Sequence, residues 1–200
     1  MAANASKLLK QAHFLLSVPD HRGLPADQGA EVAFAGRSNA GKSTALNALT
    51  QQSRLARVSK TPGRTQHLVV FELDPERRLI DLPGYGFASV PLPVRAAWGR
   101  MMEDYFHSRG SLKGLILCMD IRHPLTEFDQ QMLAFAGQRR LACHILLSKA
   151  DKLGRGAAAN TLRAVEKSLA ELGHAASVQV FSAIAGTGVD AARDWVVAQL

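Results

Sequence analysis

The chain has 200 residues, of which 47% are apolar and 20% are charged, as in an ordinary folded protein with room for one α/β domain. Lys and Arg total 24 against 17 Asp and Glu, and the net charge of +7 favours polyanionic partners such as nucleic acid. No apolar run approaches the roughly 18 residues that a membrane span needs. The sequence also argues against a zinc site and against a secretory signal. We therefore expect a cytoplasmic protein with two buried free thiols.

The N-terminal 28 residues are predicted to form a helix and a connector outside the main domain. Apolar residues at helical spacing predict a helix over 6–18, which Pro19 ends. Gly23 and Pro25 then mark a connector. The main domain is expected to span residues 29–200.

The main domain opens with an apolar strand over 31–35 and a helix over 42–50. Between them lies a segment that fits G-x-x-x-x-G-K-[ST], namely Gly36-Arg37-Ser38-Asn39-Ala40-Gly41-Lys42-Ser43. A strand–loop–helix context is what a phosphate-binding loop requires. Its amides would surround an anion, Lys42 would reach the β- and γ-phosphates, and the Ser43 hydroxyl would bind Mg²⁺. The alternative is a Gly-rich turn before an ordinary helix.

Strands and helices alternate along the rest of the chain. Strands are predicted over 67–73, 78–82, 115–120, 144–148 and 177–181, and helices over 93–108, 126–137, 157–172 and 189–200. The alternation predicts an α/β fold with a six-stranded, mostly parallel sheet and helices on both faces. The short connection 74–77 requires an antiparallel hairpin at one edge. Thr126 and Asp129 have the spacing of a capping box.

Three further motifs lie at the carboxyl ends of predicted strands, where such sheets bind ligands. The first is Asp81-Leu82-Pro83-Gly84, in which Asp81 would hold Mg²⁺ through water and the Gly84 amide would sense a γ-phosphate. The second is Ser148-Lys149-Ala150-Asp151, and the third is Phe181-Ser182-Ala183.

The second and third motifs predict recognition of guanine. The Asp151 carboxylate can accept from guanine N1–H and from the 2-amino group, which adenine cannot supply. The Lys149 stem can lie over the purine, and a backbone amide in 181–183 can contact guanine O6. A charged turn after a strand is the alternative for 148–151. In the loop 59–66, one hydroxyl should complete the Mg²⁺ shell beside Ser43, and Thr61 and Thr65 both qualify by chemistry.

The motifs together resemble those of one family of bacterial GTPases. G-R-S-N-A-G-K-S, T-P-G-R-T-Q, D-L-P-G-Y-G, S-K-A-D and F-S-A are similar to the EngB (YihA/YsxC) family, within the translation-factor-like class, over nearly the whole chain. The resemblance implies a Ras-like P-loop GTPase fold, GTP and GDP as ligands, and Thr65 rather than Thr61 as the Mg²⁺ ligand. It also extends the nucleotide-binding residues to Gly63, Arg64, Thr65, Gln66 and His67.

The same resemblance implies a biological role. It points to assembly of the large ribosomal subunit, with that subunit or its ribosomal RNA as partner, and to a need for the protein in cell division and septation. The rival functions are a P-loop kinase or ATPase, which S-K-A-D disfavours, and a GTP-dependent scaffold of the division machinery with incidental hydrolysis. We expect a monomer.

The predicted catalytic residues are Lys42, Asn39, Thr65 and Gly84. The rate of hydrolysis should further depend on the residues at positions 85, 39 and 64. Tyr85 stands where Ras-type enzymes have a Gln that orients water, which predicts slow turnover. Asn39 resembles the asparagine of potassium-stimulated GTPases, or it caps the loop. Ser148 replaces the Asn or Thr of relatives, which predicts weaker purine affinity. Arg64 would contribute transition-state charge, contact phosphate or RNA, or be solvated.

Two surfaces are predicted to meet a partner. Tyr85 and Phe87 would be exposed and change with the nucleotide, or else pack under their own loop. Basic side chains favour ribosomal RNA, namely Arg54, Arg57, Lys60, Arg64, Arg77, Arg78, Arg139, Arg140, Lys149, Lys152 and Arg155.

Overall fold

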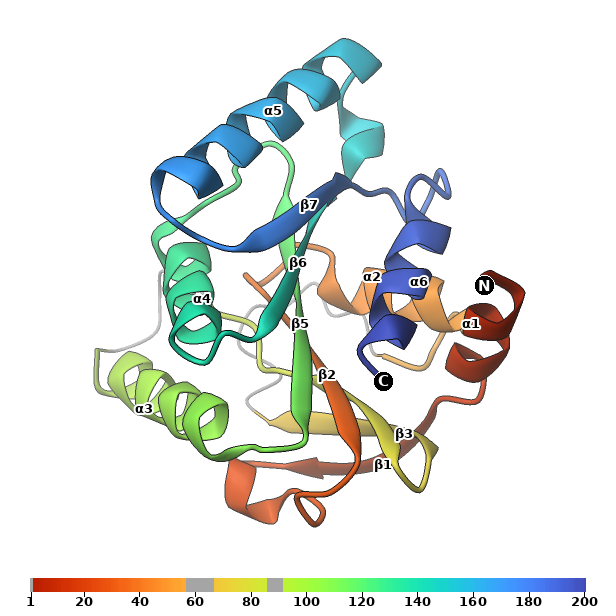
Figure 1. The fold of residues 1–200 in the computed structure, drawn as a ribbon, viewed down its shortest axis with the longest axis vertical. Helices are drawn as coiled ribbons and strands as arrows, with labels where there is room; N and C mark the ends of the chain where they lie inside the picture. Colours follow the sequence, from red (N-terminus) through yellow and green to blue (C-terminus); the bar gives the residue numbers. More distant parts are fainter. Residues whose placement is uncertain (1, 57–66, 86–91) are drawn as a thin grey trace.

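A seven-stranded sheet lies at the centre of the computed structural model, which describes residues 2–56, 67–85 and 92–200 (Figure 1). The strand order is β1-β3-β4-β2-β5-β6-β7. The strands are β1 (His13–Val18), β2 (Ala30–Gly36), β3 (Leu68–Asp74), β4 (Arg77–Asp81), β5 (Leu112–Asp120), β6 (Ala142–Ser148) and β7 (Ala176–Val180). β3 runs antiparallel to both of its neighbours, and all other neighbouring strands are parallel.

The predicted α/β class, the mostly parallel sheet and the hairpin over 67–82 are confirmed, but the sheet has seven strands rather than six. The extra strand is β1, which pairs with the free edge of β3. The prediction of a helix over 6–18 is therefore wrong in its second half, since the helix α1 (Ala2–Leu9) ends early. Gln52 holds the turn between them, because its side chain donates to the carbonyls of Lys10 at 3.1 Å and Ala12 at 2.6 Å.

Helices cover both faces of the sheet in two layers (Figure 1). One layer holds α1, α2 (Lys42–Thr50) and α6 (Val189–Ala198), and the other holds α3 (Leu92–Ser108), α4 (Glu127–Gln138) and α5 (Arg155–Glu171). Successive residues of a strand point to opposite faces. Along β2, accordingly, Val32 and Phe34 enter the core on the α1–α2–α6 side, while Ala33 and Ala35 enter the core on the other side.

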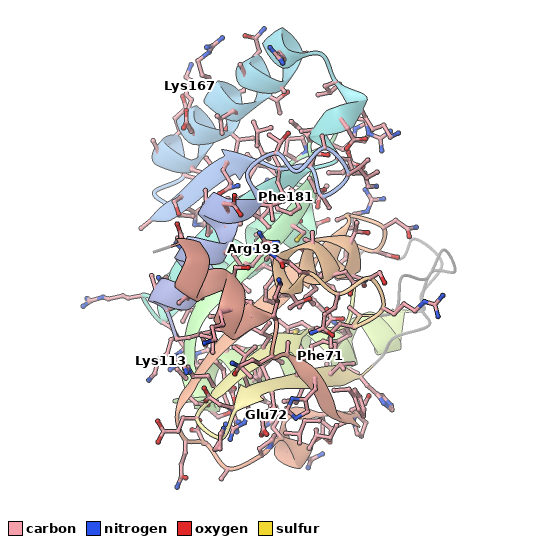
Figure 2. All side chains as sticks on the ribbon, turned by 90° about the vertical axis from the view of Figure 1, so that its right-hand side faces the viewer. Phe71, Glu72, Lys113, Lys167, Phe181 and Arg193 are labelled. Carbon is pink, nitrogen blue, oxygen red and sulfur yellow. The ribbon has the colours of Figure 1, made fainter. Side chains whose placement is uncertain are left out.

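Arg193 on α6 anchors the carboxyl end of α2 in the layer seen in Figure 2. Its guanidinium donates to the carbonyls of Leu49 at 2.9 Å and Ala48 at 2.6 Å, and the residue is buried. A cation at this end of a helix satisfies carbonyls that lack an intrahelical partner and complements the helix dipole. Arg193 thus fixes the carboxyl end of α2, whose amino end follows the predicted phosphate loop.

The interior holds two buried thiols and a buried ion pair. Cys118 and Cys143 are free and buried, as predicted, and burial raises the pKa of each thiol to about 12. At the amino end of β2, Glu31 is fully buried and receives two hydrogen bonds from Arg109, at 2.6 and 2.9 Å.

None of the helices within residues 2–56, 67–85 and 92–200 is long and apolar enough to cross a membrane.

Candidate functional site

The predicted phosphate loop, residues 36–43, joins the end of β2 to the start of α2, so the expected strand–loop–helix arrangement is present. Asn39 and Gly41 adopt left-handed backbone angles, with φ of 63° and 89°. Asparagine and glycine enter this region most readily, which explains the residue type at both positions. A Cβ atom at Gly36 would lie 2.7 Å from the carbonyl oxygen of Cys118 on β5, so only glycine fits where the loop leaves the sheet.

Lys42 and Asp81, the predicted phosphate and magnesium ligands, are in direct contact. Lys42 Nζ donates a hydrogen bond to Asp81 Oδ1, and the two residues are only 9% and 6% exposed. The pairing of β2 with β4 brings them together, because it sets Asp81 opposite Phe34, close to the start of the loop. A buried cation and a buried carboxylate therefore lie side by side beside the phosphate loop.

The oxygen donors near the loop suit a magnesium ion that also binds phosphate. Ser43 lies in the first turn of α2, next in sequence to Lys42, and Asp81 supplies a carboxylate. Magnesium is commonly held by one or two protein oxygens together with substrate phosphates and water. In the described part of the chain, no three His, Cys, Asp or Glu side chains form a group that could hold a metal. The donors present therefore fit a shared ion better than a closed protein cage.

The segment 82–85 lies directly on the phosphate loop. Leu82 N donates to the carbonyl of Phe34 at 2.9 Å, and Ser38 N donates to the carbonyl of Tyr85 at 2.8 Å. A Cβ atom at Gly84 would lie 3.5 Å from Ser38 Cα, which is an ordinary van der Waals contact. The backbone of Gly84 is thus adjacent to the loop.

Tyr85 is buried, so the prediction of an exposed aromatic surface is wrong for this residue. Its ring centroid lies 5.6 Å from that of Trp98 and 6.0 Å from that of Phe128, and its hydroxyl donates to Asp129 Oδ1 at 2.8 Å. Burial raises the pKa of Tyr85 well above its ordinary value, so the hydroxyl stays a proton donor. Phe87, the other predicted aromatic, lies outside the described residues.

Ser148 joins the predicted base motif to the phosphate loop. Its hydroxyl donates to the carbonyl of Ala40 and lies 3.0 Å from that of Met119. The side chain is buried at the end of β6, and a Cβ atom at Gly41 would lie 3.4 Å from its Oγ. Ser148, at the end of β6, therefore links the loop that follows β2 to the end of β5 through its hydroxyl. Its position in the sequence did not reveal this role.

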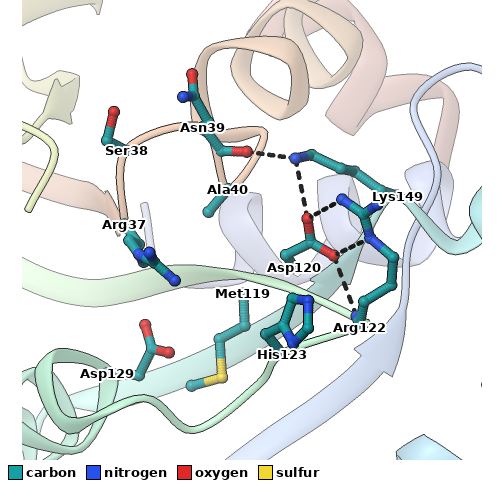
Figure 3. Close-up of a pocket in the computed structure, with 10 residues that line it drawn as sticks. All are labelled: Arg37, Ser38, Asn39, Ala40, Met119, Asp120, Arg122, His123, Asp129 and Lys149. Atoms are coloured by element: carbon teal, nitrogen blue, oxygen red, sulfur yellow. Dashed lines mark hydrogen bonds and ion pairs between the residues drawn. The ribbon is translucent and has the colours of Figure 1, made fainter. Parts of the chain in front are cut away.

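Lys149 makes a second link between the same two segments, shown in Figure 3. Its Nζ donates to the carbonyl of Asn39 and lies 3.0 Å from Asp120 Oδ2. Asp120 also accepts two hydrogen bonds from the Arg122 guanidinium, at 2.7 and 2.9 Å. Burial alone would raise the pKa of Asp120, but the bonds from Arg122 and Lys149 outweigh it and hold the pKa well below its usual range.

Sequence reasoning missed Asp120 as a member of the site. The available signal was its place at the carboxyl end of β5, between the strands that carry the phosphate loop and the base motif. With Lys149 it lines a cavity of about 260 Å³ (Figure 3). The residues around this cavity are Arg37, Ser38, Asn39, Ala40, Met119, Asp120, Arg122, His123, Asp129 and Lys149.

The predicted base-reading carboxylate meets the third motif. Asp151 Oδ1 accepts from the Ser182 hydroxyl at 2.7 Å, and Ala150 N donates to the carbonyl of Phe181 at 3.1 Å. The hydrogen bond from Ser182 is the main cause of a lowered pKa of Asp151, so the carboxylate is ionised at neutral pH. An oriented, ionised carboxylate is the acceptor that two neighbouring N–H donors of a base would need. Ala183 follows Ser182 directly, past the end of β7.

Several predicted residues cannot be placed beside these groups. Thr61, Gly63, Arg64, Thr65 and Gln66 lie outside the described residues. His67, predicted to bind nucleotide, is exposed immediately before β3, where its Nδ1 lies 3.2 Å from the hydroxyl of Ser17.

The basic residues of the hairpin do not join the site. Arg78 is buried, with its guanidinium 3.6 Å from Glu31 and 3.0 Å from the carbonyls of Gln28 and Pro75. Its predicted place in a nucleic-acid surface is therefore wrong. Arg77 pairs with Asp74 at the same turn, at the opposite end of β4 from Asp81.

Comparison with known proteins adds a family and close relatives. The family described as 50S ribosome-binding GTPase matches residues 31–149. A probable GTP-binding protein EngB from Stenotrophomonas maltophilia (strain K279a) is 58% identical over 189 residues, which cover 94% of each chain. A protein of the same name from Xanthomonas euvesicatoria pv. vesicatoria (strain 85-10) is 55% identical over 196 residues, 98% of this chain and 95% of that one.

Solved structures share the fold at lower identity. A crystal structure of a probable GTP-binding protein engB aligns with a TM-score of 0.67 at 21% identity, covering 84% of this chain and 97% of that one. A crystal structure of Era in complex with MgGDPNP and nucleotides 1506–1542 of 16S ribosomal RNA aligns with a TM-score of 0.64 at 21% identity, covering 86% of this chain and 57% of that one.

Proposed function

This chain belongs to the EngB family of GTP-binding proteins and is a GTPase, and from that premise we propose that it is a nucleotide-dependent switch in assembly of the large ribosomal subunit. The observation that carries the nucleotide part is the meeting of groups at the carboxyl ends of four strands, β2, β4, β6 and β7. Lys42 with Asp81, Lys149 with Asn39, and Asp151 with Ser182 bring phosphate and base groups to one edge of the sheet.

We assign the groups of the site as follows. The amides of residues 36–43 and Lys42 hold the phosphates, and the Gly84 amide contacts the γ-phosphate. Ser43 and Thr65 bind Mg²⁺ directly and Asp81 binds it through water; the bound ion offsets negative charge on the phosphate oxygens. Residues 29–200 form the nucleotide-binding unit, with residues 1–28 as its N-terminal extension.

The guanine end of the site uses the groups held by Ser182 and Asp120. Asp151 accepts from N1–H and the 2-amino group, the Lys149 stem covers the purine, and the Ala183 amide contacts O6. Ser148 cannot reproduce both contacts of an asparagine, but its bond to the Ala40 carbonyl keeps the loop and the base motif in register. Specificity for guanine therefore rests on Asp151.

Potassium dependence follows from the asparagine in the loop. We propose that Asn39 helps to hold a monovalent cation, which supplies positive charge near the phosphates. The left-handed backbone of Asn39 is a separate reason for an asparagine at this position. The rate of GTP hydrolysis in K⁺ and in Na⁺ distinguishes the two explanations. At equal ionic strength, we expect GTP hydrolysis in Na⁺ to be slower than in K⁺ by at least about fivefold. A decrease of this size is no larger than the loss of rate when one electrostatic contact to the transition state is removed.

Phosphate release in matched K⁺ and Na⁺ buffers measures this rate. The control is the Asn39→Gly variant, since glycine also tolerates the left-handed backbone. It should be equally slow in both salts. Identical wild-type rates in the two salts would remove the cation from the proposal.

The ribosomal role is supported by the matched family, whose description names the 50S ribosome, and by the net charge of +7. We expect the protein to sediment with large-subunit particles in the presence of a GTP analogue and to be largely released in GDP or in high salt. Sedimentation that ignores the nucleotide would contradict a switch. Absence of binding would favour the alternative, a GTP-dependent scaffold of the division machinery.

The remaining parts of the proposal come from the family resemblance. We place the protein in the cytoplasm as a monomer and expect its depletion to disturb cell division and septation. The sedimentation experiment separates a ribosomal cause of such a defect from a direct one.

A further inference from the structure

Asp129, in the first turn of α4, makes contacts that exceed those of a helix cap. Its Oδ2 accepts from Thr126 N at 2.9 Å and from Thr126 Oγ1 at 2.7 Å, which completes the predicted capping box. Its Oδ1 accepts from the hydroxyl of Tyr85 at 2.8 Å, across 44 positions of sequence. The carboxylate is only 2% exposed, so both of its oxygens are committed to these protein donors.

Tyr85 is fixed at both ends by these surroundings. Its hydroxyl donates to Asp129, and its ring packs in a cluster with the rings of Trp98 and Phe128, which also contact each other at 6.3 Å. Its carbonyl accepts from Ser38 N, inside the phosphate loop, at 2.8 Å. The residue therefore connects the start of α4 to the phosphate loop through one main-chain unit.

Gly84 precedes Tyr85 and shares a peptide bond with it, so the orientation of Tyr85 constrains the main chain at Gly84. The hydrogen bond from Ser38 N to the Tyr85 carbonyl, together with the van der Waals distance between Ser38 Cα and a Cβ atom built at Gly84, places this main chain next to the loop. The Gly84 Cα, which carries the amide nitrogen, lies in the planar peptide unit that joins Gly84 to Tyr85, so a displacement of the Tyr85 main chain would also displace this atom.

We propose that Asp129 is a positioning residue for recognition of the γ-phosphate: through the Tyr85 hydroxyl it sets the main chain of Gly84 against the phosphate loop. The inference rests on the proposed contact between the Gly84 amide and the γ-phosphate. It adds a residue from α4 that acts through Tyr85 and not through a contact of its own, since both of its carboxylate oxygens accept from protein donors, and it gives Tyr85 a function that a water-orienting glutamine does not have. GDP lacks the phosphate concerned, so the effect is confined to GTP.

The test measures equilibrium binding of a non-hydrolysable GTP analogue and of GDP, both with Mg²⁺, to the full-length protein. Tyr85→Phe removes the hydroxyl and keeps the ring in its cluster with Trp98 and Phe128. We expect the affinity for the GTP analogue to fall about fivefold, the scale of one lost hydrogen bond, and the affinity for GDP to stay within about twofold. Asp129→Asn should show the same selective loss, and the double variant no more than either single variant.

Thr126→Val is the matched control, because it removes another hydroxyl donor of the same carboxylate and leaves Tyr85 in place. It should lower the melting temperature, as loss of a cap does, without changing either nucleotide affinity. Equal losses for both nucleotides in Tyr85→Phe, no loss, or tighter binding of the GTP analogue would each overturn the inference. A wild-type protein that fails to distinguish guanine from other nucleotides would instead overturn the proposed site as a whole.

Discussion

Replacing Asp151 with asparagine should convert the protein from a guanine binder to a xanthine binder. Xanthine carries a carbonyl where guanine carries the 2-amino group, so an asparagine can accept from N1–H and donate to that carbonyl. With guanine, the asparagine amide would oppose a donor with a donor. Sites built to pair a specific polar group discriminate strongly when it is mismatched, so we expect GTP affinity to fall on the order of 100-fold or more.

Calorimetry with GTP and xanthosine triphosphate checks this exchange of preference. Asp104→Asn is the matched control, since it removes the same charge from the exposed surface of α3 and should leave both affinities unchanged. The Ser182 hydroxyl can also donate to an asparagine oxygen, so the variant keeps the contact that orients residue 151. Unaltered GTP binding by Asp151→Asn would refute the assignment of this carboxylate to the base.

Replacing Arg109 with alanine should destabilise the fold more than any substitution of an exposed charge. The variant would leave Glu31, which is fully buried, without its two short hydrogen bonds, and its remaining ion-pair partner among the described residues would be Arg78 at 3.6 Å. Breaking one partner of a buried ion pair costs about 3–5 kcal/mol. We expect a loss of that size in the free energy of unfolding, measured by urea denaturation.

Arg77→Ala is the comparison, because the Arg77–Asp74 pair lies at the same end of the sheet but is partly exposed, and such pairs contribute about 0–1 kcal/mol. Adding Glu31→Gln to Arg109→Ala should recover part of the loss, since it removes the uncompensated charge. If Arg109→Ala were no more harmful than Arg77→Ala, the buried cluster would have no special part in stability.

Much of the site could be predicted because its motifs are short and lie at strand ends. The pattern from Gly36 to Ser43 identifies a phosphate loop by local spacing, and the parallel sheet then requires that Asp81 and Asp151 approach the same edge. The capping box at Thr126 and Asp129 is also local and is confirmed. The strand–loop–helix arrangement and the capping box are confirmed, while the roles of these residues toward a nucleotide stay predictions.

Predictions failed where distant contacts decide the outcome. Residues 13–18 have apolar spacing compatible with a helix, but the free edge of β3 and the side chain of Gln52 select a strand there. The burial of Arg78 depends on Glu31, and the contact of Asp129 with Tyr85 spans two elements. None of these pairings has a signature in local sequence, because each arises only when the layers assemble.

The bonds from Ser148 to the Ala40 carbonyl and from Lys149 to the Asn39 carbonyl couple the predicted phosphate loop directly to the predicted base motif. A ligand that grips the loop also stiffens the motif that reads its base, so free energies for fragments such as guanosine and pyrophosphate should not simply add. A substitution of residue 148 during evolution would consequently alter phosphate binding as well as base recognition. Selection for GTP hydrolysis would therefore also limit which residues of the base motif can change.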